Sequence, residues 1–402
     1  MKVGVAYSTV NDSYLAGEEA AREAVMSSSM PALTFLFTTD SYDQKAVFTA
    51  VREVIGDSKM VGFCCGGIIT LEGIFTQGVG VCTLSGDELR VATSLQKDLS
   101  SNPYKIGEQS AEELLASGIE QGEVFIFPDG FGANISEMVR GLYNKMGPDF
   151  KYVGGGAGDN LRFFKTYQFT EAGIESNALA VALLDGLTIG TALGHGWNPK
   201  GAPLIIGNVE GKKVIEIDGK RAFDAYCERL LEHCPSLAEG KEVENLDTSC
   251  DQHGGIPLDK FTEYAMKYPL GFPNVLGNYL IRDPLTVNPD KSINFVTEIP
   301  VNAVGYIMEG KISELIESAG VVAKTAAKKV PQPQFALCFD CISRYLLMGK
   351  EFEKELRAIR ESVGLDVPIL GALTFGEIGS YNSIIPLFHN KTTVITVGGS
   401  KN

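Results

Sequence analysis

Residues 153–160 read VGGGAGDN, a strand-like start that passes into small residues and closes on an acid and an amide. A dinucleotide fingerprint would need G-x-G-x-x-G with a helix directly after it. Here Asp159 stands where the third glycine should be, and residues 161–170, LRFFKTYQFT, alternate in the manner of a strand. No G-x-x-x-x-G-K-[ST] occurs in the chain, which excludes a P-loop. The stretch therefore predicts a glycine turn at a strand end, and a bound phosphate is not required.

The surroundings of this stretch occur in three copies along the chain. In each copy a strand runs into a glycine (Gly62, Gly154 and Gly371), and a second glycine follows four or five residues later. The pattern predicts α/β architecture, with repeated β-α-β-β units that form mixed sheets flanked by helices in two lobes. We expect the three glycine turns to face one shared hollow. The expected strands are 2–8, 60–67, 78–84, 123–128, 177–184, 335–341, 369–379 and 392–397, and the expected helices are 16–25, 135–146 and 346–363.

A different pattern separates the second copy from the third. Residues 209–234 predict a hairpin that turns at Asp218-Gly219 and is followed by a helix. Residues 235–260 show no periodicity and predict an irregular loop. Two strands around a Pro-Asp turn and an amphipathic helix then lead into the third copy. We place the domain boundary between residues 205 and 206, which gives domains 1–205 and 206–402.

Composition narrows the classes of function. A chain of 402 residues with 44% hydrophobic and 21% charged residues is globular and long enough for about two domains. The formal net charge of -15 argues against nucleic acid or an anionic membrane surface as partner, because both attract clustered Lys and Arg. The first residues lack the apolar core of a signal peptide, and no run is long enough to span a membrane. We therefore expect a cytoplasmic protein whose eight cysteines are reduced.

Several longer motifs resemble those of FIST-domain proteins. The match to the C-terminal half of that family rests on GNYLIRDPLTVNPDKSINF (277–295), IPVNAVGYIMEG (299–310), CISRYLLMG (341–349), LGALTFGEIG (370–379) and LFHNKTTV (387–394). VGFCCGGIITLEG (61–73) and YVGGGAGDN (152–160) resemble its N-terminal half. The resemblance implies an intracellular sensory module that binds a small ligand such as an amino acid. Members are often fused to an output domain, for which this chain leaves no length, so we expect a separate signalling partner.

Charged and amide side chains near the glycine turns are the candidate ligand-binding residues. Two arginines could hold a ligand carboxylate with paired hydrogen bonds, and two acids in comparable places could hold a ligand ammonium. Neutral donors and acceptors would fix orientation. The alternatives are an internal ion pair for Arg282, a solvated charge at a helix entry for Arg344, capping of backbone amides or a structural ion pair for the acids, and a structural role for the histidine. The candidates are Arg282 with Asp283 beside it, Arg344, Glu377, Asp159, Asn160, His389, Asn390, Gly154 and Gly371.

Metal, redox and enzymatic chemistry have weaker patterns. Cys338 and Cys341 form a C-x-x-C on a predicted strand, where residues three apart face opposite sides, so a thioredoxin-like site is not expected. Of the possible zinc ligands at 227, 233, 234, 250 and 253, only Cys250 and His253 have tight spacing, and we expect no metal. The family resemblance leaves a haem-binding gas sensor open, although no motif selects an axial ligand. No known catalytic motif occurs in the chain. An enzyme that acts on a small carboxylate nevertheless stays open, because catalysis does not require a known motif.

Overall fold

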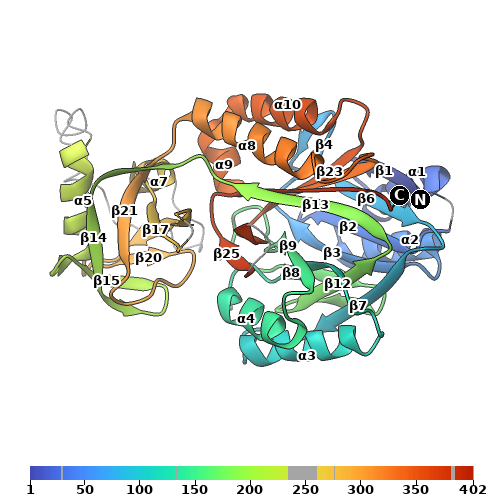
Figure 1. Cartoon of the computed structure of the whole chain (residues 1–402), viewed down its shortest axis with the longest axis horizontal. Helices are drawn as coiled ribbons and strands as arrows, with labels where there is room; N and C mark the ends of the chain where they lie inside the picture. Colours follow the sequence, from blue (N-terminus) through green and yellow to red (C-terminus); the bar gives the residue numbers. More distant parts are fainter. Residues whose placement is uncertain (29, 133, 234–259, 276, 382–384, 402) are drawn as a thin grey trace.

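The computed structural model describes residues 1–28, 30–132, 134–233, 260–275, 277–381 and 385–401. It has the predicted α/β architecture in two lobes (Figure 1). The larger lobe holds both chain ends, and the smaller lobe, built from the chain between residues 198 and 309, lies at the other end of the long axis. The expected boundary at 205/206 therefore falls inside a strand of the smaller lobe. The loop expected at 235–260 lies almost wholly outside the described residues.

Three units with the same order of elements make up the larger lobe, which confirms the three copies seen in the sequence. Each unit has an outer strand, a helix, a strand, a second helix, a strand parallel to the previous one, a short hairpin and a last strand. The first unit is β1 (Lys2–Ser8), α1 (Ser13–Ser28), β2 (Leu33–Thr39), α2 (Gln44–Ile55), β3 (Lys59–Cys65), β4 (Ile68–Thr70), β5 (Gly73–Phe75) and β6 (Val79–Ser85). The second is β7 (Arg90–Gln96), α3 (Pro103–Leu115), β8 (Gly122–Pro128), α4 (Ile135–Met146), β9 (Phe150–Gly155), β10 (Gln168–Thr170), β11 (Gly173–Glu175) and β12 (Leu179–Asp185). The third is β13 (Leu187–Gly194), α8 (Ile312–Ala327), β22 (Phe335–Cys341), α9 (Ile342–Met348), the 3-10 turn η1 (Gly349–Glu351), α10 (Phe352–Val363), β23 (Ile369–Thr374), β24 (Glu377–Gly379), β25 (Leu387–His389) and β26 (Thr393–Ser400).

The smaller lobe is inserted into the third unit, between β13 and α8. The predicted turn at Asp218 and Gly219 is present, with φ values of 52° and 75° that suit a tight two-residue hairpin. A helix follows it, as expected. Tyr226 and Phe261 are fully or almost fully buried in the core of this lobe. Its elements are β14 (Asn198–Glu210), β15 (Lys213–Ile217), β16 (Lys220–Arg221), α5 (Ala222–His233), α7 (Lys260–Lys267), β17 (Leu270–Pro273), β18 (Tyr279–Arg282), β19 (Pro284–Val287), β20 (Ile293–Phe295) and β21 (Val304–Glu309).

Each unit of the larger lobe forms a six-stranded sheet that is completed by the hairpin of another unit. The strand orders are β1-β6-β2-β3-β10-β11, β7-β12-β8-β9-β24-β25 and β13-β26-β22-β23-β4-β5. The first unit thus receives the hairpin of the second, the second that of the third, and the third that of the first. The exchange is cyclic, so every sheet depends on two units.

Gly62, Gly154 and Gly371 occupy the same register position in the three units. Each lies inside a strand, where it pairs with Leu36, Ile126 or Cys338 of the parallel neighbour. A Cβ would lie 1.8 Å from the Leu36 carbonyl oxygen at Gly62, 1.9 Å from that of Ile126 at Gly154 and 2.5 Å from that of Cys338 at Gly371. The prediction that these glycines form strand-end turns is wrong, because they permit close approach of two backbones within the sheet.

Side chains fill the space where a shared hollow was expected. Phe37, Phe127 and Phe339 directly follow the residues that pair with the three glycines, and all three are fully buried. Their ring centroids lie 5.9 Å (Phe37 to Phe127), 5.9 Å (Phe37 to Phe339) and 5.5 Å (Phe127 to Phe339) apart. Tilted and edge-on ring pairs add about 0.5–1.5 kcal/mol each beyond their burial. The three units therefore meet in a packed aromatic core.

Two local expectations are also wrong. Of the strand expected at 161–170, only Gln168–Thr170 is regular, because Leu161 and Phe163 adopt φ values of 60° and 51° that no strand accommodates. The helix expected at 346–363 is interrupted at Gly349, where φ is 51° and the backbone changes direction between α9 and α10.

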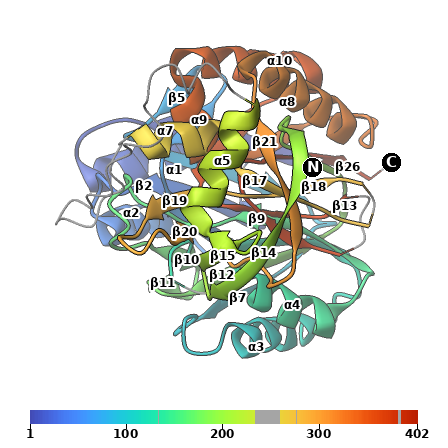
Figure 2. The ribbon, with the colours of Figure 1, turned by 90° about the vertical axis from the view of Figure 1, so that its left-hand side faces the viewer.

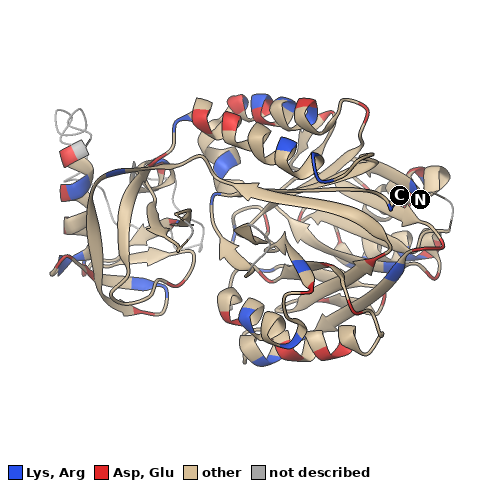
Figure 3. Cartoon of the chain, in the orientation of Figure 1, with Lys and Arg blue, Asp and Glu red and all other residues tan. Residues whose placement is uncertain are grey.

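Pairs of helices cover the outer faces of the sheets. α1 packs with α2, α3 with α4, and α8 with α10, and Figure 2 shows two of these pairs above and below the stacked strands. Charged residues of both signs lie mostly along these helices, while the central strands carry few (Figure 3). Within the described ranges, no helix has both the length and the apolar character needed to cross a membrane.

Candidate ligand site between the lobes

A cavity of about 300 Å³ lies where strand ends of the larger lobe meet the smaller lobe. The larger lobe contributes the segments that follow β8, β9, β22 and β23, and the smaller lobe contributes the β14–β15 turn, α7, β19 and β20. Ligands of open α/β sheets bind outside the carboxyl ends of the strands, and this cavity has that position. Its volume suits a small metabolite.

Three phenylalanines from separate segments form the apolar side of the cavity. Phe131 follows β8, Phe163 follows β9 and Phe375 follows β23. Their ring centroids are 5.0 Å (Phe131 to Phe163), 5.3 Å (Phe131 to Phe375) and 5.6 Å (Phe163 to Phe375) apart. Leu346 of α9 and Leu285 of β19 extend this surface. The cavity therefore favours a ligand with an apolar body.

Asp159 holds one of these aromatic residues in place. Its Oδ1 accepts hydrogen bonds from the backbone N–H of Arg162 and Phe163 at 2.9 and 3.0 Å, and its Oδ2 accepts those of Phe164 and Lys165 at 2.9 and 3.4 Å. Asp159 is only 2% exposed and does not line the interlobe cavity. The capping alternative thus accounts for Asp159. The adjacent Asn160 is exposed and does not line the cavity either.

A hydroxyl, a carboxylate and an ammonium meet on the polar side of the cavity. Ser343, in the first turn of α9, donates to Asp283 Oδ2 at 2.7 Å and accepts from Lys391 Nζ at 2.7 Å. Lys391 Nζ also lies 3.0 Å from Asp283 Oδ1. Burial raises the pKa of Asp283, while the Lys391 charge opposes that shift. Asp283 and Ser343 line the cavity, so the lobes are joined there by a charge-assisted contact.

Lys212 is the cation in the cavity wall that has no acidic partner. It lies in the turn between β14 and β15, and its Nζ donates to the carbonyl oxygen of Phe131 in the larger lobe at 3.2 Å. Among the described residues it forms no ion pair within 4.0 Å. Burial lowers the pKa of Lys212, and the charges of Glu298 and Asp129 oppose that shift without cancelling it. An anionic group in the cavity would supply the missing partner.

Arg344 is not available to a ligand in this structure. It is fully buried, and its Nη2 and Nε donate to Glu355 at 2.7 and 3.1 Å, with Asp340 Oδ1 3.1 Å from Nε. The remaining hydrogen bonds go to the carbonyl oxygens of His195, Leu315 and Lys391. Arg344 is therefore not the solvated charge at a helix entry that the sequence left open, and its donors are engaged in an internal ion-pair network instead of facing the cavity.

Arg282 also makes contacts only with protein groups. Its Nε donates to Glu298 O at 3.2 Å, and its Nη1 donates to Ile281 O and Phe388 O at 3.1 and 3.2 Å. It is 6% exposed and does not line the interlobe cavity. Burial lowers the pKa of Arg282 to about 10. Because Phe388 belongs to β25, the structure gives Arg282 the role of tying β18 to the larger lobe, in place of the expected anion clamp.

The remaining candidates divide between the cavity wall and the interior behind it. Asn390 lines the cavity and accepts from Thr297 Oγ1 at 3.1 Å. Glu377 is fully buried behind it, where it accepts from Thr374 Oγ1 at 2.7 Å and Thr392 N at 3.2 Å. Burial raises the pKa of Glu377 to about 8. Gly154 and Gly371 lie inside strands and do not line the cavity.

Neither described histidine reaches the cavity as a haem ligand would. Burial lowers the pKa of His195 to about 4 and that of His389 to about 3, so both rings are neutral. His195 Nε2 lies 3.1 Å from Tyr279 O, His389 Nε2 lies 3.2 Å from Gly379 O, and neither residue lines the cavity. His195 and His389 are therefore not placed as axial ligands at this cavity.

Cysteines and acidic residues do not gather as metal ligands in the part of the chain that the structure describes. Burial raises the pKa values of the Cys338 and Cys341 thiols well above the usual value for cysteine. Such a rise is typical of thiols buried in apolar surroundings. Of the possible zinc ligands, Cys234, Cys250 and His253 fall outside the described ranges.

Sequence reasoning missed three polar residues of the site: Lys212, Ser343 and Lys391. The last two sit inside motifs that were identified, CISRYLLMG and LFHNKTTV, next to the residues that were chosen. Lys212 follows a glycine in a hairpin turn, a context that gives no sign of a ligand contact. Only the docking of the smaller lobe brings it beside Phe131.

Comparison with known proteins gives the family of the chain. A protein of Methanocaldococcus jannaschii described as uncharacterized is 23% identical over 418 residues, which cover 95% of this chain and 75% of that protein. Among solved structures, PurLQS of Thermotoga maritima is 11% identical with a TM-score of 0.22 over 78% of this chain and 73% of that chain. Phosphoribosylformylglycinamidine synthase II of the same organism is 10% identical with a TM-score of 0.24 over 79% and 73%. These TM-scores are too low to support any inference.

Two domain matches cover most of the sequence. Residues 32–220 match the FIST N domain and residues 222–380 match the FIST C domain. The chain therefore belongs to the FIST family, whose domains are generally sensory, signal-transduction domains that bind small ligands.

Proposed function

We propose that this protein is a cytoplasmic sensor whose ligand, a small carboxylate with an apolar body such as an apolar amino acid, binds in the interlobe cavity. The observation that carries the proposal is Lys212, a largely buried cation in the cavity wall whose Nζ contacts only a carbonyl oxygen among the described residues. A carboxylate beside Lys212 gains a charge-assisted hydrogen bond from a partly buried cation. The three phenylalanines accept the apolar body of the same ligand.

The ligand would act by changing how the two lobes sit together. It touches Lys212 of the smaller lobe and Phe131, Phe163 and Phe375 of the larger lobe, so it stabilises the arrangement in which both surfaces are close. A ligand shifts a conformational equilibrium only by its difference in affinity for the two states. Because the contacts come from both lobes, a ligand here would favour the arrangement that brings both surfaces together. The closed arrangement would then be read by a separate signalling partner.

The test is a binding screen with matched variants. Leucine, phenylalanine, 3-phenylpropionate and, as a hydrophilic comparison, aspartate are added at millimolar concentration while thermal unfolding and calorimetric heats are followed. Native-state binding raises the melting temperature by mass action. Lys212→Gln should weaken binding about tenfold or more, since a charge-assisted hydrogen bond contributes about 1.5–3 kcal/mol. Lys213→Gln is the control, because Lys213 is the next residue and pairs with Asp290 on the surface.

Two results would contradict the proposal. One is that no apolar carboxylate shifts the melting temperature or gives heats, and the other is that Lys212→Gln and Lys213→Gln bind alike. The comparison of phenylalanine with 3-phenylpropionate decides whether the ammonium is recognised, for which Asp283 is the acid in the wall.

An enzyme acting on a small carboxylate is the second candidate, and Ser343 is the observation that favours it. Its hydroxyl lies in the cavity wall between Asp283 and Lys391, which resembles the grouping of a nucleophile with an acid and a base. Incubation of each bound compound followed by product analysis separates this candidate from a sensor. Turnover that disappears in Ser343→Ala would establish the enzyme, whereas recovery of unchanged ligand supports binding alone.

Haem binding through residues outside the described ranges stays a prediction. The absorbance spectrum of the purified protein checks it, since bound haem gives a strong Soret band.

A further inference from the structure

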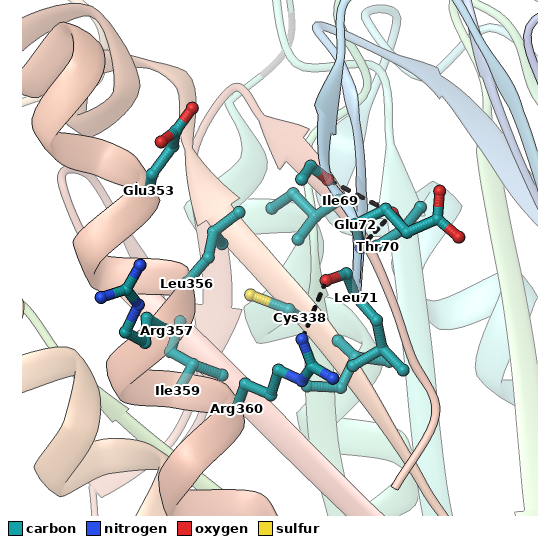
Figure 4. A pocket seen from close by; sticks show the side chains of 12 residues that line it. Ile69, Thr70, Leu71, Glu72, Cys338, Glu353, Leu356, Arg357, Ile359 and Arg360 are labelled. Carbon is teal, nitrogen blue, oxygen red and sulfur yellow. Dashed lines mark hydrogen bonds between the residues drawn. The ribbon is translucent and has the colours of Figure 1, made fainter. Parts of the chain in front are cut away.

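A second cavity of about 220 Å³ lies far from the smaller lobe, between α10 and the β4–β5 hairpin. Figure 4 shows the helix on one side and the hairpin on the other, with Arg360 extending from α10 toward the carbonyl oxygen of Leu71. The floor is apolar and includes Ile69, Ile359, Ile369 and Cys338. The helix and the hairpin come from the third and first units, so this cavity lies at one of the exchanged hairpins.

The two other exchanged hairpins provide an internal comparison for this place. Ile69, Phe169 and Ile378 each pair with the mid-strand glycine of the unit that receives the hairpin. Their partners across the hairpin are Ile74, Ile174 and Phe388. Two hairpins thus carry one phenylalanine each at these positions, whereas the β4–β5 hairpin carries two isoleucines.

Those phenylalanines fill the space against the neighbouring helix. Phe169 packs on Phe48 of α2, with ring centroids 6.5 Å apart. Phe388 lies in one cluster with Val139 and Leu142 of α4. The β4–β5 hairpin offers no ring to α10, and the space remains open there.

Smaller residues enlarge the floor of the same cavity. The position of Cys338 is Leu36 in the first unit and Ile126 in the second. The position of Ile369 is Met60 in the first unit and Tyr152 in the second, by the same registers. Tyr152 packs on Tyr143 of α4, with centroids 5.6 Å apart. Cys338 is smaller than either of its counterparts, and Ile369 is smaller than Tyr152 and shorter than Met60, so the third unit places less side chain in this space than the other two units.

Arg360 brings positive charge into the emptied space. Arg360 lies four residues before the glycine that ends α10, and its carbonyl oxygen accepts the N–H of that glycine. Arg52 in α2 and Tyr143 in α4 have the equivalent position and the equivalent hydrogen bond. Arg52 Nη1 donates to Ser58 O at 2.8 Å, but Arg360 Nη1 reaches Leu71 O only at 3.4 Å. Arg360 Nε is buried without a hydrogen-bond partner among the described residues. An unmet donor of a charged group beside an apolar cavity floor is costly, and an anion would satisfy it.

The rim carries charges of both signs. Arg357 is exposed and forms no ion pair or hydrogen bond within the described ranges, which leaves it free to approach an anion held by Arg360. Glu353 and Glu72 are also exposed at the rim, and Glu72 accepts a hydrogen bond from Tyr7. Solvent screens the exposed acids more than it screens a contact inside the cavity. The arrangement suits a single carboxylate held at Arg360, with its apolar part on the isoleucine floor.

We propose that the cavity between α10 and the β4–β5 hairpin is a second ligand site, which binds a small organic carboxylate through Arg360. The site is distinct from the interlobe cavity, and no residue lines both. Benzoate is the probe, because it joins one carboxylate to a flat apolar ring of a size that two isoleucines leave open.

The experiment observes the isoleucine δ1-methyl groups by NMR while benzoate is added to the Lys212→Gln variant. This variant binds ligands more weakly in the interlobe cavity, so a negative result at one site can be distinguished from a negative result at the other. Benzoate should shift the methyl signals of Ile69, Ile359 and Ile369, and leave Ile174 and Ile378 of the other hairpins unchanged. Arg360→Gln should weaken binding about tenfold or more, whereas Arg52→Gln, at the matching position of the first unit, should have no effect.

Ile69→Phe tests the cavity itself, since it installs the residue that the equivalent hairpin already carries. It should abolish the methyl shifts at Ile359 and Ile369 while the protein stays folded. If this variant fails to fold, Cys338→Leu, which copies Leu36, takes its place. The proposal is overturned if benzoate at 10-fold excess over millimolar protein shifts none of the three methyl groups. It is equally overturned if the shifts survive both Ile69→Phe and Arg360→Gln.

Discussion

In the first unit the central strand β2 carries Thr38 at its end, and the unit's own hairpin begins with Ile68. The same register positions in the third unit are Asp340 and Glu377. Thr38 donates to the side chain of Gln44, so this position of the first unit is neutral. Asp340 instead lies 3.1 Å from the guanidinium of Arg344, inside a network of buried charges.

The difference between the two units shows where buried charges are concentrated in this fold. Within the described residues, the ion pairs whose partners are both buried are those of Arg344 with Asp340 and Glu355 and of Lys391 with Asp283. All involve the unit into which the smaller lobe is inserted. Buried ion pairs contribute little net stability compared with apolar packing, as the neutral first unit illustrates. Their concentration beside the interlobe cavity points to a role in orienting the two lobes.

Gly154→Ala should give the largest effect, because it tests whether the three units need the same close approach. A Cβ at Gly154 would lie 1.9 Å from Ile126 O, which forces β8 and β9 apart. We expect a loss of about 4 kcal/mol or more in the free energy of unfolding, or failure to fold. Gly371→Ala, whose nearest atom is 2.5 Å away, should cost less. Urea denaturation of the two variants checks the order, and equal midpoints would contradict it.

Arg344→Met comes next and tests the charged end of the third unit directly. The change leaves Asp340 and Glu355 buried without their cation, which should cost about 3–5 kcal/mol at neutral pH. Urea denaturation at pH 7 measures the loss. Arg22→Met is the control, because its pair with Glu18 is exposed and should change stability by less than about 0.5 kcal/mol. Similar losses in both variants would mean that the buried network is not what holds this region.

Glu377→Gln tests how the buried acid of the third unit changes the pH dependence of stability, because the second unit has Gln168 at the same position. Burial raises the pKa of Glu377 to about 8, from the value of 4.5 that is usual for a glutamate. The native state therefore keeps a proton that the unfolded chain loses, so stability falls as pH rises from 4.5 to 8. The variant should show a shallower fall, by at most about 5 kcal/mol, since one pKa unit corresponds to about 1.4 kcal/mol. Parallel curves of unfolding free energy against pH for the two proteins would contradict the prediction.

Asp159→Asn has the smallest expected effect and tests the loop that only the second unit contains. The amide can replace one oxygen of Asp159 but not both, so two of the four hydrogen bonds from residues 162–165 are lost. We expect a loss of about 1–2 kcal/mol in stability. Affinity for an interlobe ligand should also fall, because Phe163 is no longer held against Phe131. Calorimetry on this variant checks the link, and unchanged affinity would show that the loop is positioned by other contacts.

Much of the fold could be predicted from the sequence because its periodic patterns are local. The strands around Gly62, Gly154 and Gly371, and helix 135–146, appear close to where the patterns place them. The exchange of hairpins could not be foreseen, because pairing of β4 with β23 leaves no local trace in either segment.

The site was harder to predict because the fate of a charged side chain depends on distant partners. Arg344 had the residue type and position of an anion clamp, but Glu355 and the carbonyl oxygens of His195 and Leu315 surround it in the folded chain. Lys212 had neither signal and nonetheless faces the cavity. Asp283 and Asn390 were chosen from the sequence, and both line the cavity wall.

The cyclic exchange of hairpins has a consequence for how the protein is made. The β4–β5 hairpin leaves the ribosome roughly 300 residues before β23, the strand with which it pairs. At translation speeds of 5–20 residues per second this is a wait of roughly 15–60 s. Throughout that time the nascent chain exposes an unpaired, apolar hairpin. A chaperone that shields such segments during synthesis should therefore raise the yield of this protein more than one that acts after release.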